Sequence, residues 1–247
     1  RPHADPARQR MSGLNALLSA PLRGLLFDLD GTLVDSVPDL AAALDTALES
    51  LGYAPAGEAR ARHWVGNGAP KLAQRGLAWA LGVDEARAPA AQVERLLAEF
   101  YRAYGEDSWS RSQLYPGVRK ALEYWAAQGI KMACVTNKPE RFTHPLLAHF
   151  GLEALLPVVV GGDTLPQRKP DPAPLLLACE GLGVSVDSTV MVGDSINDVQ
   201  AARACHMPVA CVSYGYNHGS PIADAKPDLL VAHFSELLHI EHRNPGE

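Results

Sequence analysis

The segment LRGLLFDLDGT, residues 22–32, decides the fold of this chain. Residues 22–27 form a short apolar run, which is typical of a buried strand, and an acidic loop follows at once. Since side chains alternate between the two faces of an extended segment, Asp28 and Asp30 are expected on the same side. The segment therefore predicts a buried strand that ends in two neighbouring carboxylates.

Helical and extended patterns alternate along the chain from residue 116 onward. The helices expected there cover residues 118–128, 141–150, 173–180, 197–204 and 235–240, and the strands cover residues 130–135, 157–160, 189–192, 209–212 and 229–231. Such alternation predicts an α/β fold, in which a Rossmann-like parallel sheet carries helices on both faces. The strand at 22–27 belongs to that sheet.

A helical block interrupts the strands of this predicted sheet. Apolar positions recur at helical spacing over residues 38–51, 69–81 and 84–104, and no strand is expected among them. The block needs two linkers to the sheet, near 33–37 and 109–115. The chain is therefore expected to divide into a disordered lead-in at 1–20, an α/β core at 21–36 and 113–247, and an all-helical cap domain at 37–112.

Composition restricts the partners of the chain. Its 247 residues carry a net charge of -6, and 47% of them are hydrophobic, which suits a globular protein with a core. The acidic balance argues against binding to nucleic acid or to an acidic membrane, and no apolar run is long enough to span a bilayer. The four cysteines form no C-x-x-C pair and are expected to be buried thiols in a reducing cytoplasm. The oligomeric state stays open.

Three more polar segments fall at the expected strand ends or in the loops beside them. They read TNK at 136–138, KPDP at 169–172 and GDSIND at 193–198. Any one of them alone has a simpler explanation, such as a turn or a helix cap. Ligands bind at the carboxyl ends of parallel strands. These three segments, together with the DLDGT loop, therefore predict one shared site.

The predicted site brings together the carboxylates of Asp28, Asp30, Asp194 and Asp198. Four carboxylates in one pocket repel each other, so some must be protonated or a cation must lie among them. Oxygen ligands without a cluster of Cys or His favour Mg2+. Lys169 adds a positive charge, and a cation, a lysine and hydroxyl or amide donors together suit a phosphoryl group.

At these motifs the sequence resembles the haloacid dehalogenase superfamily. The segments DLDGT at 28–32, VTNK at 135–138, KPDP at 169–172 and GDSINDVQAA at 193–202 resemble its four ordered motifs, over a match that spans about 22–231. The helical block is placed like the helical cap of that superfamily. DLDGTLVDSVPDL at 28–40, HWVGNG at 63–68 and VSYGYNHG at 212–219 also resemble the phosphoglycolate phosphatases of bacteria.

The resemblance implies a role for each residue of the catalytic set. Asp28 would attack phosphorus and form an aspartyl-phosphate, and Asp30 would protonate the leaving oxygen and then accept a proton from water. Thr136, Asn137 and nearby amides would hold the phosphoryl oxygens. Lys169 would neutralise charge on the phosphoryl group and on Asp28. The chain would thus be a hydrolase of small phosphate esters.

The resemblance also implies a metal site. Mg2+ would be bound by Asp28, by the backbone carbonyl of Asp30 and by Asp194, and Asp198 would support the metal or Lys169 from behind. The expected cofactor is therefore Mg2+, and the expected partner is a small phosphate ester.

The segment WVGNGAPK at 64–71 is expected to bind the rest of the substrate. Gly66 and Gly68 allow close approach of the backbone, with Asn67 between them, and a helix that starts near Pro70 offers free amides. Lys71 adds a charge, although a solvated first-turn lysine is the commoner arrangement. We expect this segment to bind the carboxylate of phosphoglycolate.

Several other functions share these motifs. An acid two residues after the nucleophile favours a phosphate ester over a dehalogenase or phosphonate substrate, which leaves other small-molecule phosphatases, pyrophosphatases and sugar phosphate mutases. A non-catalytic binding module on the same fold is an alternative of a different class. The intact set of Asp28, Asp30, Lys169 and Asp194 favours an enzyme.

Overall fold

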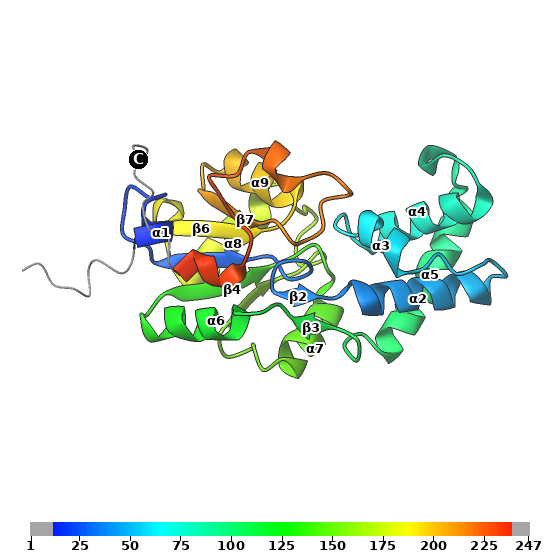
Figure 1. Cartoon of the computed structure of the whole chain (residues 1–247), viewed down its shortest axis with the longest axis horizontal. Helices are drawn as coiled ribbons and strands as arrows, with labels where there is room; N and C mark the ends of the chain where they lie inside the picture. Colours follow the sequence, from blue (N-terminus) through cyan, green and yellow to red (C-terminus); the bar gives the residue numbers. More distant parts are fainter. Residues whose placement is uncertain (1–11, 239–247) are drawn as a thin grey trace, which may run out of the picture.

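The computed structural model describes residues 12–238, and a six-stranded parallel sheet forms its centre (Figure 1). The strands are arranged in the order β5-β4-β1-β6-β7-β8, and every adjacent pair is parallel. Their bounds are Gly24–Phe27 for β1, Lys131–Val135 for β4, Val158–Val160 for β5, Thr189–Gly193 for β6, Val209–Val212 for β7 and Leu229–Val231 for β8. The predicted α/β fold with a parallel sheet is confirmed.

Helices cover both faces of the sheet because the side chains of β1 alternate between them. Leu25 and Phe27 pack in one core cluster, Leu26 packs in the other, and all three are fully buried. Each such burial contributes about 1.5–3 kcal/mol. One face is covered by α6 (Val118–Ala127), α7 (Glu140–His149) and η5 (Phe234–Leu238), and the other by α8 (Ala173–Leu182) and α9 (Ile196–Ala204).

The helices between β2 and β3 pack around a core of their own, to the right of the sheet in Figure 1. Leu44, Leu77 and Phe100 come from three of these helices and are almost completely buried. We call this part, residues 37–106, the helical insertion. Its elements are α2 (Val37–Ser50), α3 (Glu58–Trp64), α4 (Ala69–Leu81), η2 (Glu85–Arg87) and α5 (Ala90–Glu106).

The insertion differs in detail from the sequence-based expectation. The helix expected over 84–104 is interrupted, because Pro89 precedes the first turn of α5 and the 3-10 turn η2 lies before it. Helix α3 was not predicted, since seven residues are too few to show a helical period. The two linkers form an antiparallel pair, β2 (Val34–Asp35) with β3 (Gln113–Leu114), so the chain enters and leaves the insertion side by side.

The predicted disordered lead-in is wrong for residues 12–20. Helix α1 (Ser12–Asn15) precedes the sheet, and Leu14 is only 3% exposed within the core cluster that also contains Leu25. The backbone amide of Leu22 donates to Asn15 Oδ1 at 2.9 Å. The leucines of this short segment, Leu14, Leu17 and Leu18, pack on the core of the sheet and anchor it. Residues 1–11 lie outside the described residues, as does the end of the helix expected at 235–240.

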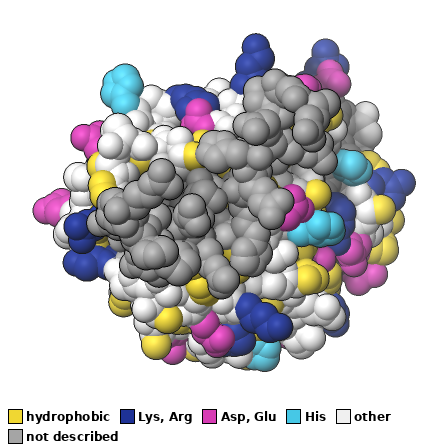
Figure 2. All heavy atoms as spheres, turned by 60° about the vertical axis from the view of Figure 1, so that its left-hand side comes forward, with side chains coloured by type: hydrophobic (Ala, Val, Ile, Leu, Met, Phe, Trp, Pro, Cys, Tyr) yellow, Lys and Arg dark blue, Asp and Glu magenta, His cyan; other side chains and the backbone are white. Residues whose placement is uncertain are grey.

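The surface carries charges of both signs. On the face shown in Figure 2, acidic and basic side chains are interspersed rather than gathered by sign. None of the helices within residues 12–238 combines the length and the apolar composition needed to cross a membrane.

Candidate active site

The four polar segments meet in one pocket at the carboxyl ends of β1, β4 and β6. Asp28 follows β1 directly, Thr136 follows β4, and Asp194 follows β6, while Lys169 comes from the loop before α8. The pocket lies where this edge of the sheet faces the helical insertion, and both contribute to its lining. On the sheet side it is lined by Asp28, Asp30, Thr136, Asn137, Lys169, Ser195 and Asn197.

Lys169 joins two of the carboxylates at the base of the pocket. Its Nζ lies 2.7 Å from Asp198 Oδ1, 3.1 Å from Asp28 Oδ1 and 2.7 Å from the carbonyl oxygen of Val135. The side chain is 2% exposed, and burial lowers its pKa, but Asp198 and then Asp28 raise the pKa by more. Lys169 is therefore protonated, and all three of its N–H groups have acceptors.

Asp28 and Asp194 carry more negative charge than Lys169 can neutralise. Burial is the main cause that raises the pKa of Asp28 to about 7, and the attraction of Lys169 only partly offsets it. Burial, followed by repulsion from Asp28 and Asp198, raises the pKa of Asp194 well above its usual value. A cation bound among these carboxylates would favour their ionised forms and offset the repulsion between them.

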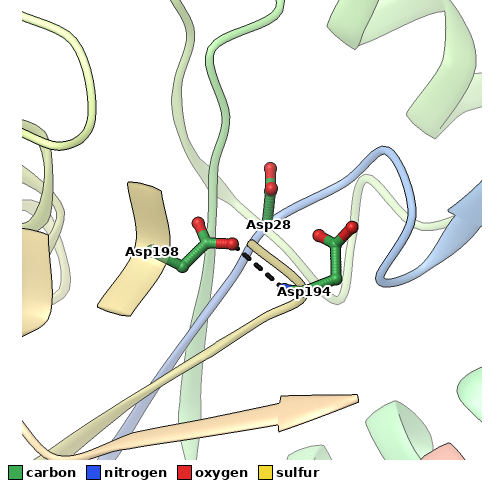
Figure 3. A group of neighbouring side chains, drawn as sticks. All are labelled: Asp28, Asp194 and Asp198. Carbon is green, nitrogen blue, oxygen red and sulfur yellow. Dashed lines mark hydrogen bonds between the residues drawn. The ribbon is translucent and has the colours of Figure 1, made fainter. Parts of the chain in front are cut away.

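Three carboxylates of the site lie close enough together to hold a cation. One oxygen from each of Asp28, Asp194 and Asp198 lies within 4.8 Å of the others, and their side chains face one another in Figure 3. Asp198 is already bonded on both oxygens, since Oδ1 accepts from Lys169 and Oδ2 accepts from the amides of Asp194 and Ser195. Both Asp198 oxygens are therefore occupied within the protein, and the side chain orients Lys169 and the loop after β6.

Asp194 is held in position by groups from two segments. Its Oδ1 accepts from the Thr32 hydroxyl at 2.8 Å, and its Oδ2 accepts from the backbone amide of Tyr216 at 2.6 Å. Gly31 has a φ of +83°, and a Cβ there would come within 2.3 Å of Asp194 Oδ2. Only glycine allows the DLDGT loop to approach this carboxylate so closely.

The Asp30 side chain turns away from Asp194 and towards the start of α7. Lys138 Nζ lies 3.1 and 3.2 Å from its two oxygens, and the hydroxyl of Ser36 donates to the same carboxylate. Both oxygens of the Asp30 carboxylate are thus engaged by Lys138, and one of them also by Ser36. Lys138 and Ser36 were not predicted as site residues, although Lys138 stands inside the VTNK motif.

Thr136 and Asn137 place hydrogen-bond donors at the carboxyl end of β4. The Thr136 amide donates to Val160 O at 2.9 Å and its Oγ1 accepts from the Lys138 amide at 3.1 Å, so the hydroxyl proton remains available to a ligand. The Asn137 side chain donates to Lys169 O at 2.9 Å, which fixes the KPDP loop beside it. Both residues line the pocket as predicted by their position in the chain.

The segment at 64–71 only partly reaches the pocket. Gly66 and Gly68 line it, with φ of +127° and +88°. Asn67 instead accepts from Arg75 at 3.0 Å, and Lys71 donates to Gln74 and forms an ion pair with Glu85. Neither Asn67 nor Lys71 lines the pocket, because Arg75 holds Asn67 and Glu85 of η2 holds Lys71; their contacts with the substrate stay a prediction.

The fold and this site define the class of protein. A family model of haloacid dehalogenase-like hydrolases matches residues 22–206, so the chain belongs to this family of hydrolases.

Individual relatives agree with this assignment. The chain is 48% identical over 229 residues to the phosphoglycolate phosphatase of Pseudomonas putida, with 92% of this chain and 83% of the relative covered. It is 44% identical over 218 residues to the phosphoglycolate phosphatase of Nitrosococcus oceani, with 87% and 95% covered. The crystal structure of a predicted phosphoglycolate phosphatase from Haemophilus somnus superposes with a TM-score of 0.82 at 38% identity, with 89% of this chain and 98% of that chain covered.

Proposed function

We propose that this protein is a Mg2+-dependent phosphoglycolate phosphatase of the cytoplasm, which hydrolyses 2-phosphoglycolate to glycolate and phosphate. The observation that carries the proposal is the buried arrangement of Asp28, which lies between Lys169 and Asp194 and faces the pocket. The names of the relatives from Pseudomonas putida and Nitrosococcus oceani supply the substrate. The four cysteines are free, in keeping with a reducing compartment.

Asp28 is the proposed nucleophile. Its Oδ1 accepts from the Leu29 amide at 2.8 Å and lies 3.1 Å from Lys169, which orients the carboxylate and leaves its other oxygen for attack. In the first step this oxygen bonds to phosphorus, the phosphorus–oxygen ester bond breaks, and Asp30 gives a proton to the leaving oxygen. In the second step water attacks phosphorus, the bond between phosphorus and the Asp28 oxygen breaks, and Asp30 accepts a proton from that water, which releases phosphate and restores Asp28.

Asp28, Asp194 and the backbone carbonyl of Asp30 are the proposed ligands of Mg2+, which supplies positive charge next to the phosphoryl oxygens when bound. Oxygen-only donors and the raised pKa values of the two carboxylates fit a hard divalent cation. Thr136 and the amides beside it would donate to the transferring group, and Lys169 would keep Asp28 in line with phosphorus.

A substrate panel tests this proposal. We expect the purified protein to release phosphate from 2-phosphoglycolate only with Mg2+, and with a higher kcat/KM than from sugar phosphates, nucleotides or pyrophosphate. A preference for a sugar phosphate would instead assign the chain to another phosphatase of the same family. Binding of phosphate esters without any turnover would favour a non-catalytic module. Asp28→Asn is the matched control for contaminating activity.

A further inference from the structure

The pocket holds a second buried lysine whose hydrogen-bonding capacity is not used up. Lys138 is 5% exposed in its side chain, and its Nζ contacts the two oxygens of a single carboxylate, that of Asp30. Lys169, by contrast, has acceptors on three separate groups. An ammonium group carries three donors, so Lys138 can bind Asp30 and one further anion.

A buried hydroxyl lies beside this lysine. The Tyr104 side chain reaches the pocket from α5 of the helical insertion, and Lys138 Nζ lies 4.7 Å from the centre of its ring. Tyr104 is 1% exposed; Lys138 lies beside its hydroxyl, and the hydroxyl proton has no acceptor in residues 12–238. Burial raises the pKa of Tyr104 to about 12, so the hydroxyl keeps its proton and is a donor at neutral pH. Such an unpaired buried donor normally costs free energy unless a ligand accepts from it.

The rest of this end of the pocket is apolar. Leu40, Leu72, Phe100 and Phe142 complete the lining around Tyr104. Among the described lining residues, Lys138 and Lys169 are the only cationic side chains. Since Lys169 is already engaged by three acceptors, Lys138 is the cation available beside Tyr104 for a negative group of the substrate other than its phosphate.

We infer that Lys138 and Tyr104 together bind a carboxylate of the substrate and so determine its specificity. The inference rests on the proposed function, because it requires Asp30 to lie next to the ester oxygen that it protonates. In 2-phosphoglycolate one methylene separates the carboxylate from that oxygen, and Lys138 bonds directly to Asp30. The carboxylate would then reach Lys138 when the ester oxygen reaches Asp30. Because Tyr104 belongs to the insertion and Lys138 to the sheet side, the same carboxylate would join the two parts over the pocket.

The test compares two esters in two variants of the whole protein. Ethyl phosphate replaces the carboxylate of 2-phosphoglycolate with a methyl group, so the ratio of the two kcat/KM values measures recognition of the carboxylate. Lys138→Met should lower this ratio by about 10- to 100-fold, since it removes a charge-assisted hydrogen bond. Tyr104→Phe removes only the hydroxyl and should lower the ratio by about 2- to 10-fold. Lys120→Met, at an exposed lysine of α6 that does not line the pocket, is the matched control and should leave the ratio unchanged.

The outcomes separate this inference from the proposed function. An equal loss on both esters in Lys138→Met would show that the lysine acts through Asp30 alone, and would overturn its assignment. An unchanged ratio in Tyr104→Phe, a variant that leaves Asp30 and Lys138 intact, would overturn the assignment of Tyr104. A wild-type protein that does not prefer 2-phosphoglycolate to ethyl phosphate would already refute the proposed substrate, before any variant is compared.

Discussion

Replacing Asp28 with Asn should stabilise the metal-free protein at pH 8, although it removes the proposed nucleophile. The Asp28 side chain is 14% exposed, and its charge lies close to Asp30, Asp194 and Asp198 with Lys169 as the neighbouring cation. Asparagine has almost the same shape and no charge. The substitution should therefore keep the packing of the pocket while it removes one source of repulsion.

The magnitude follows from the pKa of Asp28, which lies at about 7 in the folded metal-free protein against about 3.9 for a free aspartate. As pH rises through this window the unfolded chain loses its proton first, so the free energy of unfolding falls and the loss is complete above pH 7. Each pKa unit corresponds to about 1.4 kcal/mol, so the full shift costs about 4 kcal/mol. Because the neighbouring Asp194 titrates together with Asp28, we expect the substitution to recover about 2–3 kcal/mol at pH 8.

Urea unfolding in the presence of EDTA at pH 5 and pH 8 measures this effect. We expect Asp28→Asn to be more stable than wild type at pH 8, by a margin that shrinks at pH 5. Asp198→Asn is the control, for which we expect a loss of stability. It removes the charge of the fully buried partner of Lys169 and should lower the free energy of unfolding by about 3 kcal/mol. A gain for Asp28→Asn that is absent at pH 8, or equal at the two pH values, would refute the reasoning.

Three further substitutions probe the site. Asp194→Ala should raise the Mg2+ concentration for half-maximal activity by at least about tenfold, since the cation loses one of its few protein ligands; titration with MgCl2 measures this. Asp30→Asn should lower kcat/KM more for ethyl phosphate than for p-nitrophenyl phosphate, because the aryl oxygen leaves without a proton; equal losses would argue against Asp30 as the acid. Gly31→Ala should abolish activity, because its Cβ would come within 2.3 Å of Asp194; near wild-type turnover would show that the loop can move aside.

The sheet and the core of the site could be predicted from the sequence because both depend on local patterns. Short apolar runs mark the strands, and the segments with Asp28, Thr136 and Asp194 each stand directly at a strand end, so parallel topology alone brings these three residues together. Helix α4 was predicted at 69–81 as observed, since Gly68 and Gly82 delimit a clear helical period.

The remaining features depend on contacts between distant residues, which a sequence pattern does not show. Lys138 resembles any lysine after a strand until the fold places it against Asp30, 108 positions earlier in the chain. Lys71 resembles an anion-binding residue at a helix start until the turn η2 presents Glu85 to it. Leu14 belongs to a segment too short to show a period of its own, and only the core of the sheet explains its burial.

The most direct test of the account is to trap the covalent intermediate on Asp28. The enzyme is mixed with 2-phosphoglycolate and Mg2+, quenched in acid during turnover and treated with borohydride, which reduces an acyl phosphate to the alcohol and would convert Asp28 to homoserine. We predict that peptide mass spectrometry finds homoserine at position 28, and that the product is absent when Mg2+ or substrate is left out. Turnover without any modified aspartate, or with the modification at Asp30, Asp194 or Asp198, would contradict the assignment of Asp28 as the nucleophile.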